Sequence, residues 1–99
     1  MLRYSIVGAI TNATEEEKDL FNIAEEKLRK LGHEVFNPLS LEERFPRYTW
    51  EDYMEMCLQE LIQNRNILVL PTAHKSRGAM LEIQTAQALK YNIEGYDAL

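Results

Sequence analysis

The segment from Lys75 to Glu82 combines residues that can hold an anion with one that can do chemistry beside it. Ser76 and Gly78 precede a stretch with helical periodicity, and the free backbone amides and positive dipole of a helix start attract anions. Lys75 and Arg77 add positive charge to the same stretch. Glu82 lies four residues beyond Gly78, about one helical turn, so its carboxylate is expected beside the same anion site.

A carboxylate in this position suits attack on a sugar carbon. Near the positive end of a helix, Glu82 is expected to stay ionised, which is the form that a nucleophile toward an anomeric carbon requires. A plainer interpretation is that the helix dipole favours an acid at Glu82 and that Ser76 only caps the helix. The residues alone leave both interpretations open.

Strands alternating with helices are predicted to position this segment. Short apolar, β-prone runs predict strands, and apolar residues that recur at helical spacing predict helices. Thr14 with Glu17 and Thr49 with Asp52 have the spacing of capping boxes, which start helices. The predicted strands are residues 3–8, 33–36, 67–70 and a short last one at 93–96, and the predicted helices are residues 15–31, 49–64 and 78–91.

This order of elements predicts one α/β domain over residues 1–99. We expect a three-layer α/β/α arrangement with a Rossmann-like or flavodoxin-like parallel sheet of four to five strands. Such sheets bind ligands beyond the carboxyl ends of their strands. The loops at that end are residues 8–12, 37–48 and 71–78, so the anion segment lies where a site is expected.

Composition narrows the classes of partner. The formal net charge of −5 argues against a nucleic acid polymer, because backbone binding needs clustered Lys and Arg. No apolar run is long enough for a membrane span or a signal peptide, so a cytoplasmic protein without membrane contact is expected. Cys57 stands alone and His33 and His74 are far apart, so neither a metal nor another cofactor is predicted.

Four stretches of the chain resemble, in order, the nucleoside 2-deoxyribosyltransferases, the deoxynucleoside monophosphate N-hydrolases and a related, poorly characterised family. The stretch from Ser76 to Glu82 is similar to their Ser-x-Gly-(x)3-Glu signature. The other three resemble the glycine turn after the first strand, the second strand and the start of the second helix. They are Gly8-Ala9-Ile10-Thr11, Leu31-Gly32-His33-Glu34-Val35-Phe36-Asn37-Pro38 and Trp50-Glu51-Asp52-Tyr53-Met54.

The resemblance implies cleavage or transfer at the N-glycosidic bond of a small-molecule nucleoside or nucleotide. Glu82 would be the nucleophile, Ser76 and Gly78 would hold the 5′ side of the sugar, and Gly8 and Ile10 would contact the substrate from the first turn. Water or a second base would be the acceptor. The family analogy also implies a homodimer or larger homo-oligomer.

Two positions depart from the family pattern. Ser5 stands where the family usually has a tyrosine, and the neighbouring Tyr4 is expected on the opposite face of the strand. Arg65 and Asn66 stand where the family often has an aspartate near the base. These departures keep two further hypotheses open, namely a pocket that binds a nucleotide without turnover and a protein that keeps only the fold.

Four other residues near the predicted site have two interpretations each. Asp52 is a candidate acid for the leaving base, although its capping-box position favours a structural role. Trp50 is either a lid that stacks on a base or packing for the loop beneath its helix. Asn12 is a candidate ligand for a sugar hydroxyl or phosphate, or a turn residue. His74 is predicted to be an exposed loop histidine rather than an acid.

Overall fold

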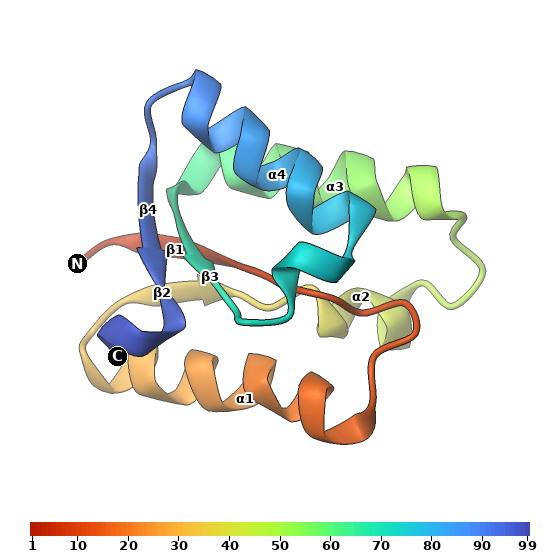
Figure 1. Ribbon diagram of the computed structural model, residues 1–99, viewed down its shortest axis with the longest axis horizontal. Helices are drawn as coiled ribbons and strands as arrows, with labels where there is room; N and C mark the ends of the chain where they lie inside the picture. Colours follow the sequence, from red (N-terminus) through yellow and green to blue (C-terminus); the bar gives the residue numbers. More distant parts are fainter.

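A four-stranded parallel sheet lies at the centre of the computed structural model, which describes residues 1–99 (Figure 1). Its strands are β1 (Arg3–Val7), β2 (Glu34–Phe36), β3 (Arg65–Val69) and β4 (Asn92–Gly95), in the spatial order β2-β1-β3-β4. All neighbouring strands are parallel. The predicted α/β fold is confirmed, with four strands.

Helices cover both faces of the sheet and complete the three predicted layers (Figure 1). α1 (Glu15–Lys30) lies on one face, and α3 (Trp50–Asn64) and α4 (Arg77–Ala88) lie side by side on the other. A short helix, α2 (Leu39–Arg44), follows β2, and single 3-10 turns at Ala73–Lys75 and Tyr96–Ala98 follow β3 and β4. None of the helices combines the length and the apolar composition needed to cross a membrane.

Alternation along β1 divides the core between the two faces of the sheet. Tyr4 packs with Phe21 of α1, whereas Val7 packs with Leu61 of α3. Ser5 is buried, and it accepts a hydrogen bond from the side chain of Asn64 at the end of α3. The predicted placement of Tyr4 and Ser5 on opposite faces is therefore confirmed.

Side-chain caps fix the starts of the three longer helices. Both predicted capping boxes are present, with Thr14 and Glu17 at the start of α1 and Thr49 and Asp52 at the start of α3. In each box the threonine hydroxyl accepts a hydrogen bond from the backbone N–H of the acid, and the carboxylate of the acid accepts one from the backbone N–H of the threonine. Ser76 caps α4 in a simpler way, through its hydroxyl alone.

The prediction of a continuous loop over residues 37–48 is wrong, because α2 occupies the middle of it. The Asn37 side-chain oxygen accepts the Leu39 backbone N–H at 3.0 Å, and Leu41 is the one residue of α2 that is buried. A helix of six residues with one buried side chain leaves no helical periodicity to detect in the sequence.

Other element ends differ from the prediction by up to three residues. β3 begins at Arg65 rather than at residue 67, because its polar start still pairs with Arg3 of β1. Ladder hydrogen bonds need no apolar side chain, so a search for apolar runs misses such ends. α4 ends at Ala88 rather than at residue 91, and β4 covers residues 92–95 rather than 93–96.

Candidate functional site

A cavity of about 90 Å³ opens at the carboxyl end of the sheet. Its wall is formed by the turn after β1, by α2 and by the beginnings of α3 and α4. Two hydrogen bonds join the adjoining loops, since Leu70 N–H donates to the Val7 carbonyl at 2.8 Å and Ala9 N–H donates to Thr72 Oγ1 at 3.1 Å. The three loops predicted to meet at this end therefore share one cavity.

Six of the eight residues predicted to form the site line this cavity. They are Gly8, Ile10, Trp50, Ser76, Gly78 and Glu82. These residues come from the turn after β1, the start of α3 and the start of α4. The fold brings them together from distant parts of the sequence.

The other two predicted residues, Asn12 and Asp52, do not line the cavity. Asp52 is exposed, and its carboxylate accepts the Thr49 N–H at 3.0 Å within the capping box. Asn12 is exposed in a turn with a φ of 63°, a left-handed conformation that asparagine tolerates better than most residues. Both residues therefore have the structural role that was the alternative in each case.

Glu82 is the buried acid of the cavity. It is 8% exposed, and its carboxyl group has no hydrogen-bond or ion-pair partner within the chain. Burial raises the pKa of the Glu82 carboxyl group to about 8, because the charged form loses its hydration. No fully buried side-chain oxygen of the chain lacks a hydrogen-bond partner, so the Glu82 carboxyl oxygens are open to the cavity. An acid with a raised pKa facing a cavity is typical of functional sites.

The prediction that Glu82 stays ionised is therefore wrong for the cavity without a ligand. The favourable effect of a helix dipole is worth about 1 kcal/mol at most helix starts, whereas loss of hydration by a buried carboxylate costs more. A pKa near 8 leaves about one molecule in ten ionised at pH 7.

The start of α4 has free hydrogen-bond donors beside Ser76 and Gly78, which line the cavity. Ser76 Oγ accepts the Ala79 N–H at 3.1 Å, and the Ser76 carbonyl accepts the Met80 N–H at 3.0 Å. The backbone amides of Arg77 and Gly78 donate to no group of the chain. Unpaired amides of this kind bind anionic or other hydrogen-bond-accepting groups.

The two cations of this segment have different surroundings. Lys75 forms an ion pair with Glu17 of α1, so the positive charge predicted to attract an anion there is already neutralised. Arg77 has no carboxylate partner, and its guanidinium carbon lies 3.9 Å from the centroid of the Trp50 ring.

Close packing explains both glycines of the cavity. A Cβ atom on Gly78 would lie 2.7 Å from Met54 Sδ, and one on Gly8 would lie 2.8 Å from Leu70 Cδ1. Neither glycine has a positive φ, so backbone conformation does not require glycine at these positions. Gly78 therefore lets α4 approach α3 closely enough to form the cavity wall.

Sequence reasoning missed most of the wall contributed by α2 and α3. The missed residues that line the cavity are Met54 and Cys57 of α3 and Leu41 and Glu42 of α2. Burial raises the pKa of the Cys57 thiol to about 12, with a smaller contribution from Glu82. Met54 and Cys57 are buried residues of α3 together with Leu61, so their spacing alone indicates core packing. Their continuity with Trp50 at the start of the same helix was the signal that they also face a site.

The positions that depart from the family pattern all lie outside the cavity. The Tyr4 hydroxyl donates to Glu94 of β4 on the α1 side of the sheet, and Ser5 Oγ accepts a hydrogen bond from Asn64 Nδ2 at 3.0 Å. Arg65 and Asn66 begin β3 at the amino end of the sheet.

Among the remaining candidates, Trp50 lines the cavity and His74 does not. His74 is exposed, as predicted, although its Nδ1 lies 2.9 Å from the Pro71 carbonyl, a contact that orients the ring. Tyr53 also lines the cavity, and its hydroxyl donates to the Phe45 carbonyl at 2.6 Å.

The sequence model of a family described as "Domain of unknown function (DUF4406)" matches residues 2–94. The chain belongs to this family. The matched span of the DUF4406 domain includes every residue that lines the cavity.

A solved structure supplies the fold comparison for this DUF4406 domain. A 2-deoxyribosyltransferase from the psychrotolerant bacterium Bacillus psychrosaccharolyticus is similar to it with a TM-score of 0.75 and 19% sequence identity. The similarity covers 94% of this chain and 70% of that one. The predicted nucleoside 2-deoxyribosyltransferase-like fold is therefore confirmed. No curated protein matches the chain.

Proposed function

We propose that this DUF4406 domain cleaves the N-glycosidic bond of a nucleoside or nucleotide through a covalent glycosyl-Glu82 intermediate. The observation that carries the proposal is the Glu82 carboxyl group, which is buried without a partner in a cavity that also contains the start of α4. Stability gives no reason for such a group, because an unpaired buried acid is costly. The likeness of fold to a 2-deoxyribosyltransferase supports the same class of reaction.

The start of α4 holds the 5′ side of the sugar in this proposal. The amides of Arg77 and Gly78 and the Ser76 hydroxyl supply the donors, and Glu82 lies one helical turn further along the same helix. The cavity of about 90 Å³ is smaller than the roughly 300–1,000 Å³ of pockets that enclose whole ligands. It therefore takes the sugar and leaves the base at the mouth, beside Trp50.

Cleavage then proceeds in two steps. Glu82 first loses its proton to solvent. An oxygen of the carboxylate then forms a bond to C1′ while the C1′–N bond breaks, and the base leaves with the electron pair and takes up a proton from solvent. Water, or an N–H nitrogen of a second base, then forms a bond to C1′, loses a proton to solvent and releases Glu82 as a carboxylate. Asp52 lies outside the cavity, and the other wall acid, Glu42, lies 4.0 Å from Lys18 Nζ in an ion pair, so solvent supplies the proton for the leaving base.

A second candidate function is nucleotide binding without turnover. One observation favours it, namely that the cavity lacks both the tyrosine of the family pattern and Asp52, the acid considered for the leaving base. In this case the cavity still takes the same ligand, and only release of the base is missing.

Release of free base distinguishes the two functions. The protein is incubated with deoxynucleoside monophosphates and with the matching nucleosides, and the base is quantified by chromatography. The Glu82→Gln variant, which keeps the shape but not the nucleophile, is expected to lower the rate by about a thousandfold or more. Glu55→Gln, at an exposed position of α3 outside the cavity, is the matched control and is expected to keep the full rate.

Three outcomes decide between the candidates. Base release that survives Glu82→Gln would rule out the covalent mechanism. A wild-type protein that releases no base but is stabilised against heat by nucleotides would have the binding function. A homodimer, also expected from the family analogy, is tested by sedimentation of the same samples with and without ligand.

A further inference from the structure

Arg77, the first residue of α4, has no carboxylate partner. Lys75 is paired with Glu17, and Lys18 Nζ lies 4.0 Å from a Glu42 carboxylate oxygen. The Arg77 guanidinium instead lies over the Trp50 ring, 3.9 Å from its centroid. An aromatic ring is therefore the only charge-stabilising partner that holds this guanidinium, at the first residue of α4.

Trp50 connects this contact to the cavity. The indole lines the cavity wall, is 36% exposed, and has its Nε1 atom 3.7 Å from where a Cβ on Gly78 would lie. Arg77 itself is not part of the wall. The indole thus contacts both the cavity and the guanidinium, so a movement of the guanidinium can change the position of the indole in the cavity wall.

An anion at the start of α4 would compete with Trp50 for Arg77. A cation–π contact at an exposed site changes an equilibrium constant by about two- to fivefold, whereas hydrogen bonds between Arg and a phosphate change it by about tenfold or more. The anion therefore wins this competition. The helix start alone would not identify a ligand site, but Glu82, buried and unpartnered in the same cavity, independently marks it as one.

We propose that Arg77 selects substrates that carry an anionic group at the 5′ end of the sugar, and that it does so by exchanging Trp50 for that group. The anion binds to the free amides at the start of α4 and draws the guanidinium off the ring. The released indole then closes over the base at the cavity mouth, where aromatic faces stack well. This inference rests on the proposed function for the kind of ligand, but it requires binding only and no bond cleavage.

The exchange makes the 5′ group and the base cooperate. A nucleoside with only a 5′ hydroxyl leaves Arg77 on Trp50, so the indole stays in its unliganded position. A 5′-monophosphate forms hydrogen bonds with the guanidinium, and its base also stacks on the released indole. Arg77 is in this sense a positioning residue, because it acts on the base through Trp50.

The single tryptophan of the chain reports on this exchange directly. Trp50 fluorescence is titrated with deoxynucleoside 5′-monophosphates, with the matching nucleosides and with inorganic phosphate. We expect monophosphates to change the emission and to bind at least about tenfold more tightly than nucleosides. Inorganic phosphate alone is expected to reproduce the part of the change that comes from loss of the guanidinium.

Variants separate Arg77 from charge in general. Arg77→Gln is expected to reduce the preference for monophosphates by about tenfold or more and to remove the response to inorganic phosphate. Arg77→Lys, which keeps the charge, is expected to recover part of the preference. Arg44→Gln is the matched control, because Arg44 also lies over an aromatic ring, 5.3 Å from the Phe45 centroid, but Phe45 does not line the cavity and Arg44 is not at the start of α4.

The two proposals fail in different ways. Equal affinity for monophosphates and nucleosides, or a preference that Arg77→Gln leaves unchanged, would overturn the role of Arg77 whether or not base is released. A fluorescence response that depends on Arg77, in a protein that releases no base, would support that role and remove the glycosidase proposal alone.

Discussion

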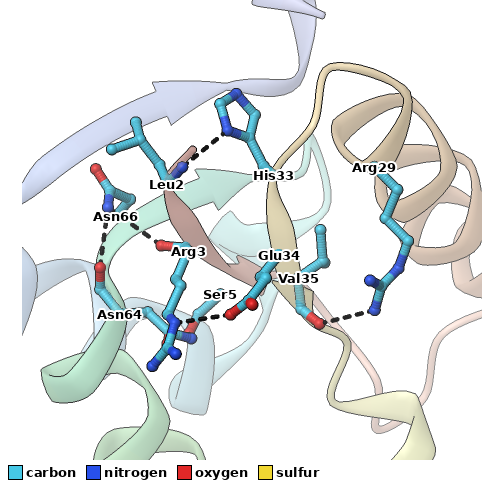
Figure 2. Close-up of polar contacts among 9 residues, drawn as sticks. All are labelled: Leu2, Arg3, Ser5, Arg29, His33, Glu34, Val35, Asn64 and Asn66. Carbon is cyan, nitrogen blue, oxygen red and sulfur yellow. Dashed lines mark hydrogen bonds and ion pairs between the residues drawn. The ribbon is translucent and has the colours of Figure 1, made fainter.

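At the amino end of the sheet, polar side chains form hydrogen bonds and ion pairs with one another and with the backbone. At the carboxyl end, the most deeply buried acid has no such partner. Figure 2 shows the amino end, where Asn64 donates to Ser5, Asn66 donates to the Arg3 and Asn64 carbonyls, and Arg3 pairs with Glu34. Glu82, at the other end, is 8% exposed and unpartnered. Polar groups that serve the fold are satisfied within it, and one that is not satisfied points to a ligand.

Two glutamates show the same contrast. Glu94 of β4 accepts hydrogen bonds from the Tyr4 hydroxyl and from Asn92, and these contacts join β4 to the centre of the sheet. Burial, and then the contact with Glu94, raises the pKa of Tyr4 to about 12. Tyr4 is therefore committed to a structural contact on the α1 side, and a tyrosine near Glu82 is not available from this strand.

The sharpest test of the contrast is the effect of pH on stability. The pKa of folded Glu82 is about 8, above its ordinary value of 4.5, so between these values the folded state binds a proton that the unfolded chain has released. The stability contributed by this group is fully present below the lower value and is lost as the pH rises to the higher one. The loss is on the order of a few kcal/mol, measured by urea unfolding across the pH range.

The Glu82→Gln variant isolates this effect, because it cannot ionise. We expect it to lack this part of the pH dependence and to be more stable than wild type at pH 8, while Glu55→Gln follows wild type throughout. If Glu82→Gln and wild type lose stability in parallel as the pH rises, folding does not raise the pKa of Glu82. The contrast between the two ends of the sheet then disappears.

Local sequence signals were sufficient for most of the fold. The capping boxes at Thr14 and Thr49 depend on residues three positions apart, and the apolar runs of β1 and β3 depend on adjacent residues. α2 was missed because its helical state depends on a tertiary contact of Leu41 rather than on its own periodicity. Elements that depend on residues close together in the sequence could be predicted, and the helix that depends on a tertiary contact could not.

The same distinction between local and tertiary information applies to the site. The rule that ligands bind at the carboxyl ends of parallel strands placed Gly8, Ser76 and Glu82 in one region, and all three line the cavity. The partner of Lys75 and the burial of Glu82 depend on the packing of separate helices. A sequence shows neither of these, so the ionisation of Glu82 and the ion pair of Lys75 were mispredicted.

A second test reshapes the carboxyl end without adding charge. The Cβ of a Gly78→Ala variant would lie 2.7 Å from Met54 Sδ, near the end of a flexible side chain. Met54 is expected to move into the cavity, which displaces the sugar and lowers base release by about a hundredfold, with a stability loss of only about 1 kcal/mol. Steady-state rates and urea unfolding are measured together.

Gly95→Ala is the control for Gly78→Ala, because nothing lies within 4 Å of the added Cβ. It is expected to change neither the rate nor the stability by much. A Gly78→Ala protein with full activity would show that the cavity between α3 and α4 does not hold the sugar.

The smallest expected effect lies at the amino end, where the structure predicts a change in stability without a change in activity. Asn64→Ala removes the donor to Ser5 Oγ and leaves that hydroxyl, in a residue that is 1% exposed, without a partner. We expect a loss of about 2 kcal/mol in the free energy of unfolding. Base release should be unchanged, because neither residue lines the cavity.

The double variant Ser5→Ala, Asn64→Ala makes this test specific to the hydrogen bond. Removing both partners leaves no unsatisfied group, so part of the stability lost in Asn64→Ala is expected to return in the double variant. If the double variant is instead as unstable as the sum of the two single ones, the Ser5 to Asn64 contact contributes no coupling. The amino end would then owe its stability to apolar packing, and satisfied polar groups would no longer distinguish it from the end that contains Glu82.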